Sequence, residues 1–84
     1  MDKIYSIIFY DDGVKVYLLN DDYHKEDGPA RIHPDGYKEW WLNGKLHRED
    51  GPAIEYPEGE KFYYLNGLYY SEKEFKKILT KNLK

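Results

Sequence analysis

The sequence contains no cysteine and only one methionine among its 84 residues. Without cysteine, neither a disulfide nor a thiolate metal site can stabilise so short a chain. A long hydrophobic run is also missing, because the apolar stretch at 4–10 is interrupted by Ser6 and followed by Asp11 and Asp12. That stretch is far shorter than the roughly 20 residues of a membrane-spanning helix and lacks the flanks of a signal peptide. We therefore expect a soluble, cytoplasmic protein.

The motifs of common catalytic sites are absent as well. The sequence has no Gly-rich phosphate loop, no nucleophile elbow and no serine at a characteristic spacing from a histidine. Basic residues are scarce over residues 1–70, where eight Lys and Arg face 14 Asp and Glu, whereas residues 71–84 carry five Lys against two Glu. Because phosphate backbones are bound by basic surfaces, the acidic body argues against nucleic acid as a direct ligand. We expect no enzymatic activity and no cofactor.

Two nearly identical segments indicate a repeat protein. The segment HKEDGPA at 24–30 returns as HREDGPA at 47–53, and a period of 23 residues aligns 19–41 with 42–64. The period places Gly13, Gly36 and Gly59 in register, with partial copies at 1–18 and 65–84. Such a repeat is typical of one supersecondary unit stacked on copies of itself. We therefore treat residues 1–84 as a single domain built from these four segments.

Each repeat is predicted to form a β-hairpin. The segments PDG at 34–36 and PEG at 57–59 are turn signals, and aromatic-rich stretches follow them. Strands are expected at 4–10, 14–19, 29–33, 37–42, 52–56 and 60–65. After residue 70 the pattern changes, since Ser71 and Glu74 form a capping box and Phe75 begins an apolar helical stripe. The expected fold is mainly β, a single-layer antiparallel sheet of stacked 23-residue hairpin repeats with one C-terminal α-helix.

The segment YKEWWLNGKLHREDGPAIEYPEG at 37–59 resembles the MORN repeat, which also runs 23 residues. Matching positions are Tyr37, Trp41, Asn43, Gly44, Lys45, His47 and Gly59. The chain departs from the family pattern after the histidine, where Arg48 stands in place of a glycine. The resemblance covers about residues 11–70 and points to a divergent subfamily found in phage, viral and bacterial proteins. It implies an elongated sheet of stacked hairpins and a role as a scaffold or protein-interaction module.

The repeated histidines and aspartates could suggest a metal or acid–base site. His24 and Asp27 recur as His47 and Asp50. However, the loops of successive hairpins should lie two strand spacings apart, roughly 10 Å, which is too wide for one ion. We therefore interpret these four residues as structural: the aspartates should hydrogen-bond backbone N–H groups of their own turn, and each histidine should tie its loop to the neighbouring repeat. No metal site is expected.

Aromatic residues fall on both faces of the predicted sheet. Alternate residues of a strand share a face, so Tyr17, Trp40 and Tyr63 lie on one side, and Trp41 and Tyr64 lie on the other with Leu18. A single layer cannot bury both faces against one short helix. We expect one face to be covered by the helix and the other to stay partly open or bind a partner, and Tyr and Trp are the residue types that dominate binding hot spots. Those five aromatic residues are the predicted partner-binding residues.

The first predicted strand is uncharged and apolar on both sides. It opens the sheet, so it is expected to be an edge strand without the usual protective charges. Pairing with a second copy of the chain would satisfy its free backbone groups. The sequence therefore predicts a homodimer, either through the first strand, at an edge that includes Ile4, Tyr5, Ile7 and Phe9, or through the open aromatic face.

Three classes of function remain open from the sequence. The favoured one is a small non-enzymatic module that docks a macromolecular partner, an unidentified protein, on an aromatic sheet face. The alternative is an acidic inhibitor of the phage type that blocks a host defence or nucleic-acid-processing protein by charge mimicry. Lipid binding through the Lys-rich helix is the third, but that helix is short and its apolar stripe is narrow, so we expect no membrane among the partners.

Overall fold

The computed structural model describes residues 2–82, which form ten strands and one helix. The chain enters the sheet through β1 (Tyr5–Phe9), β2 (Lys15–Leu19) and β3 (Asp22–Tyr23). It continues through β4 (Arg31–Ile32), β5 (Lys38–Glu39), β6 (Trp41–Leu42), β7 (Lys45–Leu46) and β8 (Ile54–Glu55). It ends with β9 (Lys61–Leu65), β10 (Leu68–Tyr70) and α1 (Glu72–Asn82). The predicted fold class, mainly β with one C-terminal helix, is confirmed.

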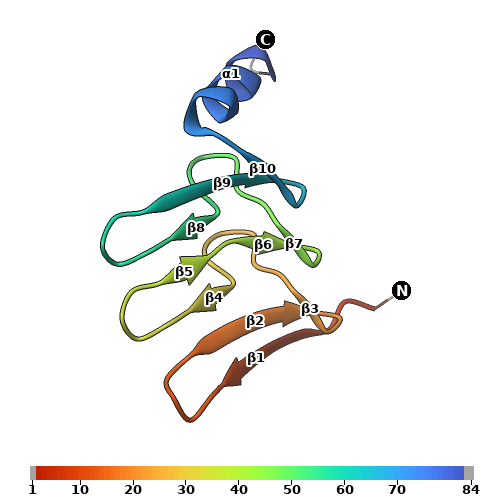
Figure 1. Cartoon of the computed structure of the whole chain (residues 1–84). Coiled ribbons are helices and arrows are strands. Elements are labelled where there is room, and N and C mark those ends of the chain that lie inside the picture. Colours follow the sequence, from red (N-terminus) through yellow and green to blue (C-terminus); the bar gives the residue numbers. More distant parts are fainter. Residues whose placement is uncertain (1, 83–84) are drawn as a thin grey trace.

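The main sheet is a row of antiparallel hairpins. Its strand order is β1-β2-β4-β5-β8-β9-β10, which follows the order of the chain. The short strands β3, β6 and β7 lie outside this row: β3 pairs with β2, and β6 pairs with β7. The turns at Gly13, Gly36 and Gly59 have φ angles of 92°, 102° and 111°, which only glycine adopts without strain. The molecule measures 39 × 39 × 17 Å, and Figure 1 shows the hairpins stacked from β1 at one end to α1 at the other.

A second, shorter hairpin follows in every repeat, and the sequence prediction missed it. Asn43 and Gly44 both have positive φ angles, 50° and 79°, as a two-residue type I′ turn requires, and they join β6 to β7. Asn66 and Gly67 join β9 to β10 in the same way. Both Asn-Gly pairs lie directly beyond the predicted strands 37–42 and 60–65, where no further hairpin was expected. The predicted strand 37–42 is correspondingly divided, since β5 belongs to the long hairpin and β6 to the short one.

One residue per repeat marks the point where a strand changes partner. The N–H of Tyr17 donates to the carbonyl of Ala30 in the long hairpin, and its own carbonyl accepts from the N–H of His24 after the short one. Trp40 makes the same pair of bonds with Ala53 and His47. The repeating unit therefore holds two hairpins on one continuous strand, and the chain between them must pass over one face of the sheet.

The buried core is small. Val14, Val16 and Leu18 form it on one side of β2, and Tyr23 packs against them. Ala30 and Ala53 are fully buried on the other side, beneath the loops. A thin plate of this kind buries few large side chains, so contacts between repeats must contribute much of its stability.

The helix begins as predicted. The Ser71 hydroxyl accepts from the Glu74 N–H at 3.1 Å, and the Glu74 carboxylate accepts from the Ser71 N–H at 3.0 Å, which is a complete capping box. Phe75 is buried and lies 4.8 Å, ring to ring, from Tyr63 of β9. The helix therefore closes the end of the stack. Among residues 2–82, no helix has both the length and the apolarity needed to cross a bilayer.

Candidate functional site

The repeated HxEDGPA loops tie one repeat to the next on one face of the sheet. We call this side, which bears Tyr17, Trp40 and Tyr63, the loop face. The Nδ1 atom of His24 accepts a hydrogen bond of 2.9 Å from the backbone N–H of Asn43, one repeat ahead. His47 makes the equivalent 2.9 Å bond to the N–H of Asn66. The contact between each histidine and its neighbouring repeat, expected from the sequence, is present in both copies.

Each loop also places a cation over an aromatic ring of the loop face. The Lys25 ammonium lies 4.3 Å from the centre of the Tyr17 ring, and the Arg48 guanidinium lies 3.9 Å from that of Trp40. Both distances are within the range of a cation–π interaction. In the third repeat the helix starts where this cation would stand, and Phe75 packs on Tyr63 instead. Tyr17, Trp40 and Tyr63 are therefore each covered from within the chain.

The aspartates of the loops hold those cations. Asp27 accepts from the Lys25 ammonium at 3.0 Å, and Asp50 accepts from Arg48 Nε at 2.9 Å. These hydrogen bonds are the main reason that the pKa values of both carboxyls lie below the usual value for aspartate. The prediction that the aspartates bond backbone N–H groups of their own turn is therefore incomplete, because the side chain two residues earlier is the stronger partner.

A groove runs between the two loops. It has a volume of about 610 Å³, with Trp40 and Leu42 on its floor and the segments 25–29 and 47–50 as its walls. The carboxylates of the walls are already engaged: Glu26 and Glu49 pair with the Nε2 atoms of His24 and His47. Within residues 2–82, no three His, Asp or Glu side chains gather closely enough to hold a metal ion.

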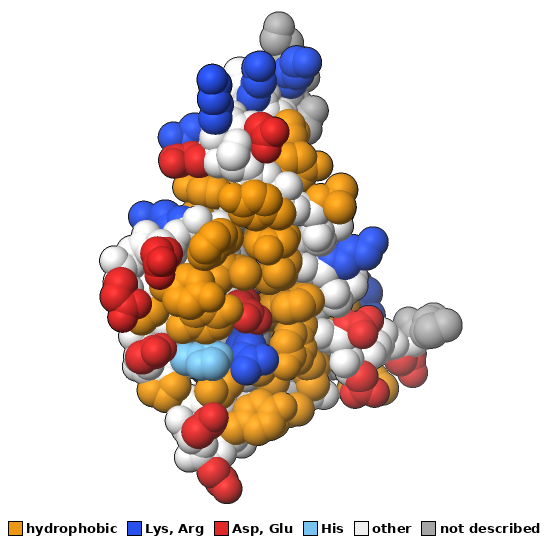
Figure 2. All heavy atoms as spheres, in the orientation of Figure 1, with side chains coloured by type: hydrophobic (Ala, Val, Ile, Leu, Met, Phe, Trp, Pro, Cys, Tyr) orange, Lys and Arg blue, Asp and Glu red, His pale blue; other side chains and the backbone are white. Residues whose placement is uncertain are grey.

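The opposite side of the sheet carries a group of aromatic rings, most of which pack against one another. We call it the aromatic face; its rings are Tyr37, Trp41, Tyr56, Phe62, Tyr64 and Tyr69. Successive centroids lie 4.8 Å apart from Tyr37 to Tyr56, 5.9 Å from Tyr56 to Phe62 and 6.4 Å from Phe62 to Tyr69. Tyr56 and Tyr69 keep 39% and 59% of their surface exposed. Figure 2 shows hydrophobic side chains joined into one surface along the stack.

Polar side chains lie within this apolar surface. The Glu39 carboxylate accepts from the Tyr37 hydroxyl at 2.6 Å and from the Trp41 indole N–H at 2.8 Å. Across the register from Glu39, Arg31 donates to His33 Nε2 at 3.0 Å and to the Tyr23 hydroxyl at 3.3 Å. In Figure 2 a histidine and a basic side chain lie side by side among the hydrophobic groups.

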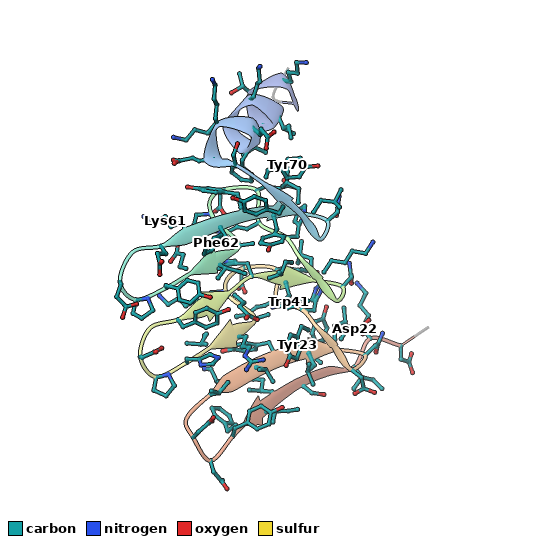
Figure 3. The ribbon with its side chains drawn as sticks, viewed as in Figure 1. Asp22, Tyr23, Trp41, Lys61, Phe62 and Tyr70 are labelled. Atoms are coloured by element: carbon teal, nitrogen blue, oxygen red, sulfur yellow. The ribbon has the colours of Figure 1, made fainter. Side chains whose placement is uncertain are left out.

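These hydrogen bonds fix the orientation of the rings. Tyr37 and Trp41 are both held by one carboxylate, and Tyr23 packs edge-on against Trp41 with their centroids 5.1 Å apart (Figure 3). Burial, reinforced by the hydrogen bond to Glu39, raises the pKa of Tyr37 well above its usual value, so Tyr37 stays a hydrogen-bond donor. A shallow depression of about 450 Å³ lies beside it, lined also by Tyr56, Asp35 and Glu58.

The structure thus separates the five predicted partner-binding residues. Trp41 and Tyr64 belong to the aromatic face, whereas Tyr17, Trp40 and Tyr63 lie beneath loop cations or the helix. We expected the helix to cover one face. The helix covers only Tyr63, and the loops cover Tyr17 and Trp40. Sequence reasoning missed Tyr37, Tyr56 and Tyr69. The spacing of Tyr37, Glu39 and Trp41 at i, i+2 and i+4 was the available signal.

The predicted edge residues lie at the start of the sheet. β1 pairs with β2 and with no other strand among residues 2–82. Ile4, Tyr5, Ile7 and Phe9 are all exposed, and Phe9 retains 74% of its surface. Their position and exposure agree with an unprotected edge.

Comparison with known proteins gives no further guide to function. No protein-family model, no curated protein and no solved structure shows significant similarity to this chain.

Proposed function

We propose that this chain is a non-enzymatic protein-binding module that docks a partner protein on its aromatic face. The observation that carries the proposal is the ordered series of rings from Tyr37 to Tyr69, in which Tyr56 and Tyr69 remain exposed. Exposed aromatic rings that already pack against their neighbours lose little conformational freedom on binding, which favours affinity. The resemblance to the MORN repeat, taken as a hypothesis, agrees with such a role.

The chemistry of the rim indicates which partner surface fits. Asp35 and Glu58 border the depression beside Tyr37 and Tyr56. A partner that presents an apolar patch flanked by Lys or Arg would match both the rings and these carboxylates. Rim charges of this kind set the association rate and the orientation more than the affinity.

The test is affinity capture of the partner with matched variants. Tyr56→Ser and Tyr69→Ser remove exposed rings of the aromatic face, whereas Leu68→Ser removes a side chain that is equally exposed, at 62%, on the opposite side of the same strand as Tyr69. We expect the two tyrosine variants to lose the partner and the leucine variant to retain it. Equal loss in all three, with folding intact by circular dichroism, would exclude the aromatic face as the docking surface.

An acidic inhibitor remains the second candidate, and one arrangement favours it. Asp12, Asp35 and Glu58 fall at the same position of successive long-hairpin turns, and Glu26 and Glu49 fall at the same position of successive loops. The chain therefore carries rows of carboxylates at a regular spacing of roughly 10 Å. Salt separates the two functions. Binding by charge mimicry weakens steeply between about 50 and 500 mM salt, whereas aromatic docking persists.

A further inference from the structure

We infer that β1 is a self-complementary edge, and that two copies of the chain pair their β1 strands antiparallel about a two-fold axis at Ile7. This surface is distinct from the aromatic face, so the inference goes beyond the proposed function. In the stack of Figure 1, β1 forms the end opposite α1. Its exposed residues are apolar or aromatic, and none of residues 4–10 is charged.

The hydrogen bonds of β1 show which backbone groups are free. Tyr10 donates to the carbonyl of Val14, and the carbonyl of Ile4 accepts from the N–H of Asn20, so the even-numbered residues bond inward to β2. Inward and outward groups alternate along an antiparallel strand. The N–H and C=O groups of Tyr5, Ile7 and Phe9 therefore point away from β2 along the open edge, where a second strand can pair with them.

The side chains select one register for that second strand. With the axis at Ile7, each Ile7 lies opposite its symmetry mate and Tyr5 lies opposite Phe9 of the other copy, which forms aromatic pairs on the loop face. Beyond the ends of β1, the same register brings Lys3 of one copy towards the turn that contains Asp11 of the other. Opposite charges and aromatic pairs are the favourable cross-strand combinations.

The neighbouring registers lack this match. Moving the axis to Ser6 places Lys3 opposite Phe9, and moving it to Ile8 places Tyr5 opposite Asp11. Each shift thus breaks both Tyr5–Phe9 pairs and sets one of these two rings opposite a residue outside β1 (Tyr5–Phe9). Full overlap of the two β1 strands, with its aromatic pairs, therefore fixes the register.

Cysteine cross-linking tests the register directly, since the chain has no cysteine of its own. Ser6 and Ile8 would face each other in a non-hydrogen-bonded pair, with Cα atoms about 4.5 Å apart, a distance that a disulfide spans. We expect a mixture of the Ser6→Cys and Ile8→Cys variants to form the mixed disulfide dimer on mild oxidation. Each variant alone should cross-link poorly. Efficient cross-linking of either variant alone would overturn the register, since it requires the axis at Ser6 or at Ile8.

Light scattering and sedimentation of the wild-type chain at micromolar concentrations test the association itself, and a dimer is expected. Ile7→Lys should raise the dissociation constant at least about tenfold, because a lysine on an edge opposes strand pairing. Leu68→Lys is the matched control, since Leu68 is equally apolar and exposed but lies on β10 at the other end of the sheet. A monomer at every concentration, or a dimer weakened by Leu68→Lys and unchanged by Ile7→Lys, would refute pairing through β1.

Discussion

The side chain of His24 reaches from its own loop to the backbone N–H of Asn43, one repeat further along the chain, at 2.9 Å. His47 and Asn66 stand in the same relationship. The two contacts differ in burial, since 4% of the His24 side chain is exposed and 11% of that of His47. One bond between repeats thus occurs twice, once in the interior and once nearer to solvent.

Replacing these histidines should therefore cost different amounts of stability. His24→Ala removes a buried ring and leaves the Asn43 N–H without its acceptor, so we expect a loss of about 2 kcal/mol in the free energy of unfolding. His47→Ala should cost about 1 kcal/mol, because water can replace the ring more readily. Urea unfolding at pH 7 measures both. An equal or larger loss for His47→Ala would contradict the role given to burial.

The first short turn offers a stabilising substitution. Asp21 has a φ angle of 70°, in the left-handed region, at the position that Gly44 and Gly67 occupy in the other repeats. Asp21→Gly should relieve this strain and stabilise the chain by about 0.5–1 kcal/mol, raising the melting temperature by a few degrees. The neighbouring Asp22→Gly is the control, since Asp22 lies in β3 and glycine weakens a strand. The prediction is wrong if Asp21→Gly lowers the melting temperature.

The loop ion pairs make stability depend on pH in the acidic range. Since Arg48 holds the pKa of Asp50 below the usual 3.8, the folded state binds the proton less tightly than the unfolded state does. The stabilisation is thus present above about pH 4 and is lost as the pH falls through the folded pKa. Carboxyl titration by NMR should place the Asp50 midpoint below 3.8. Arg48→Ala should move it up towards that value, and an unmoved midpoint would show that Arg48 is not the cause.

The helix should depend on one ring and one cap. Phe75 has 3% of its surface exposed and packs on Tyr63, so Phe75→Ala should cost about 3 kcal/mol, while Phe75→Leu should cost less than about 1.5 kcal/mol. Ser71→Ala removes the oxygen that accepts from Glu74 and should cost about 1 kcal/mol. Thermal unfolding gives all three values. A loss from Phe75→Ala no larger than that from Ser71→Ala would mean that the helix does not hold the end of the sheet.

Local chemistry was enough to predict some parts of this fold. The turn at Gly36 and the reciprocal bonds of Ser71 and Glu74 depend only on residues close in the sequence. The short hairpins were missed because strands of two or three residues, such as Lys45–Leu46, are too brief to show a hydrophobic period. Their only signal was the pair of residues able to take positive φ at the turn.

For the two tryptophans, the sequence predicts the face of the sheet on which each lies but not the groups that surround it. Alternation along the strand places Trp40 and Trp41 on opposite faces, and the structure agrees. Which of them is covered depends on Arg48, whose loop crosses the sheet along a path that no periodic pattern specifies. The side-chain hydrogen bond of Trp41 depends on Glu39, a charged residue that a pattern of hydrophobicity alone would assign to solvent.

The bonds that join repeats each span the same short stretch of chain, 19 residues from His24 to Asn43 and from His47 to Asn66. These bonds do not involve β1 or α1, so the two ends of the sheet do not set the number of repeats between them. Duplicating residues 42–64 would give the new segment the same neighbours on both sides and would lengthen the plate by roughly 10 Å. The length of the sheet can therefore change by whole repeats of 23 residues while β1 and α1 stay the same.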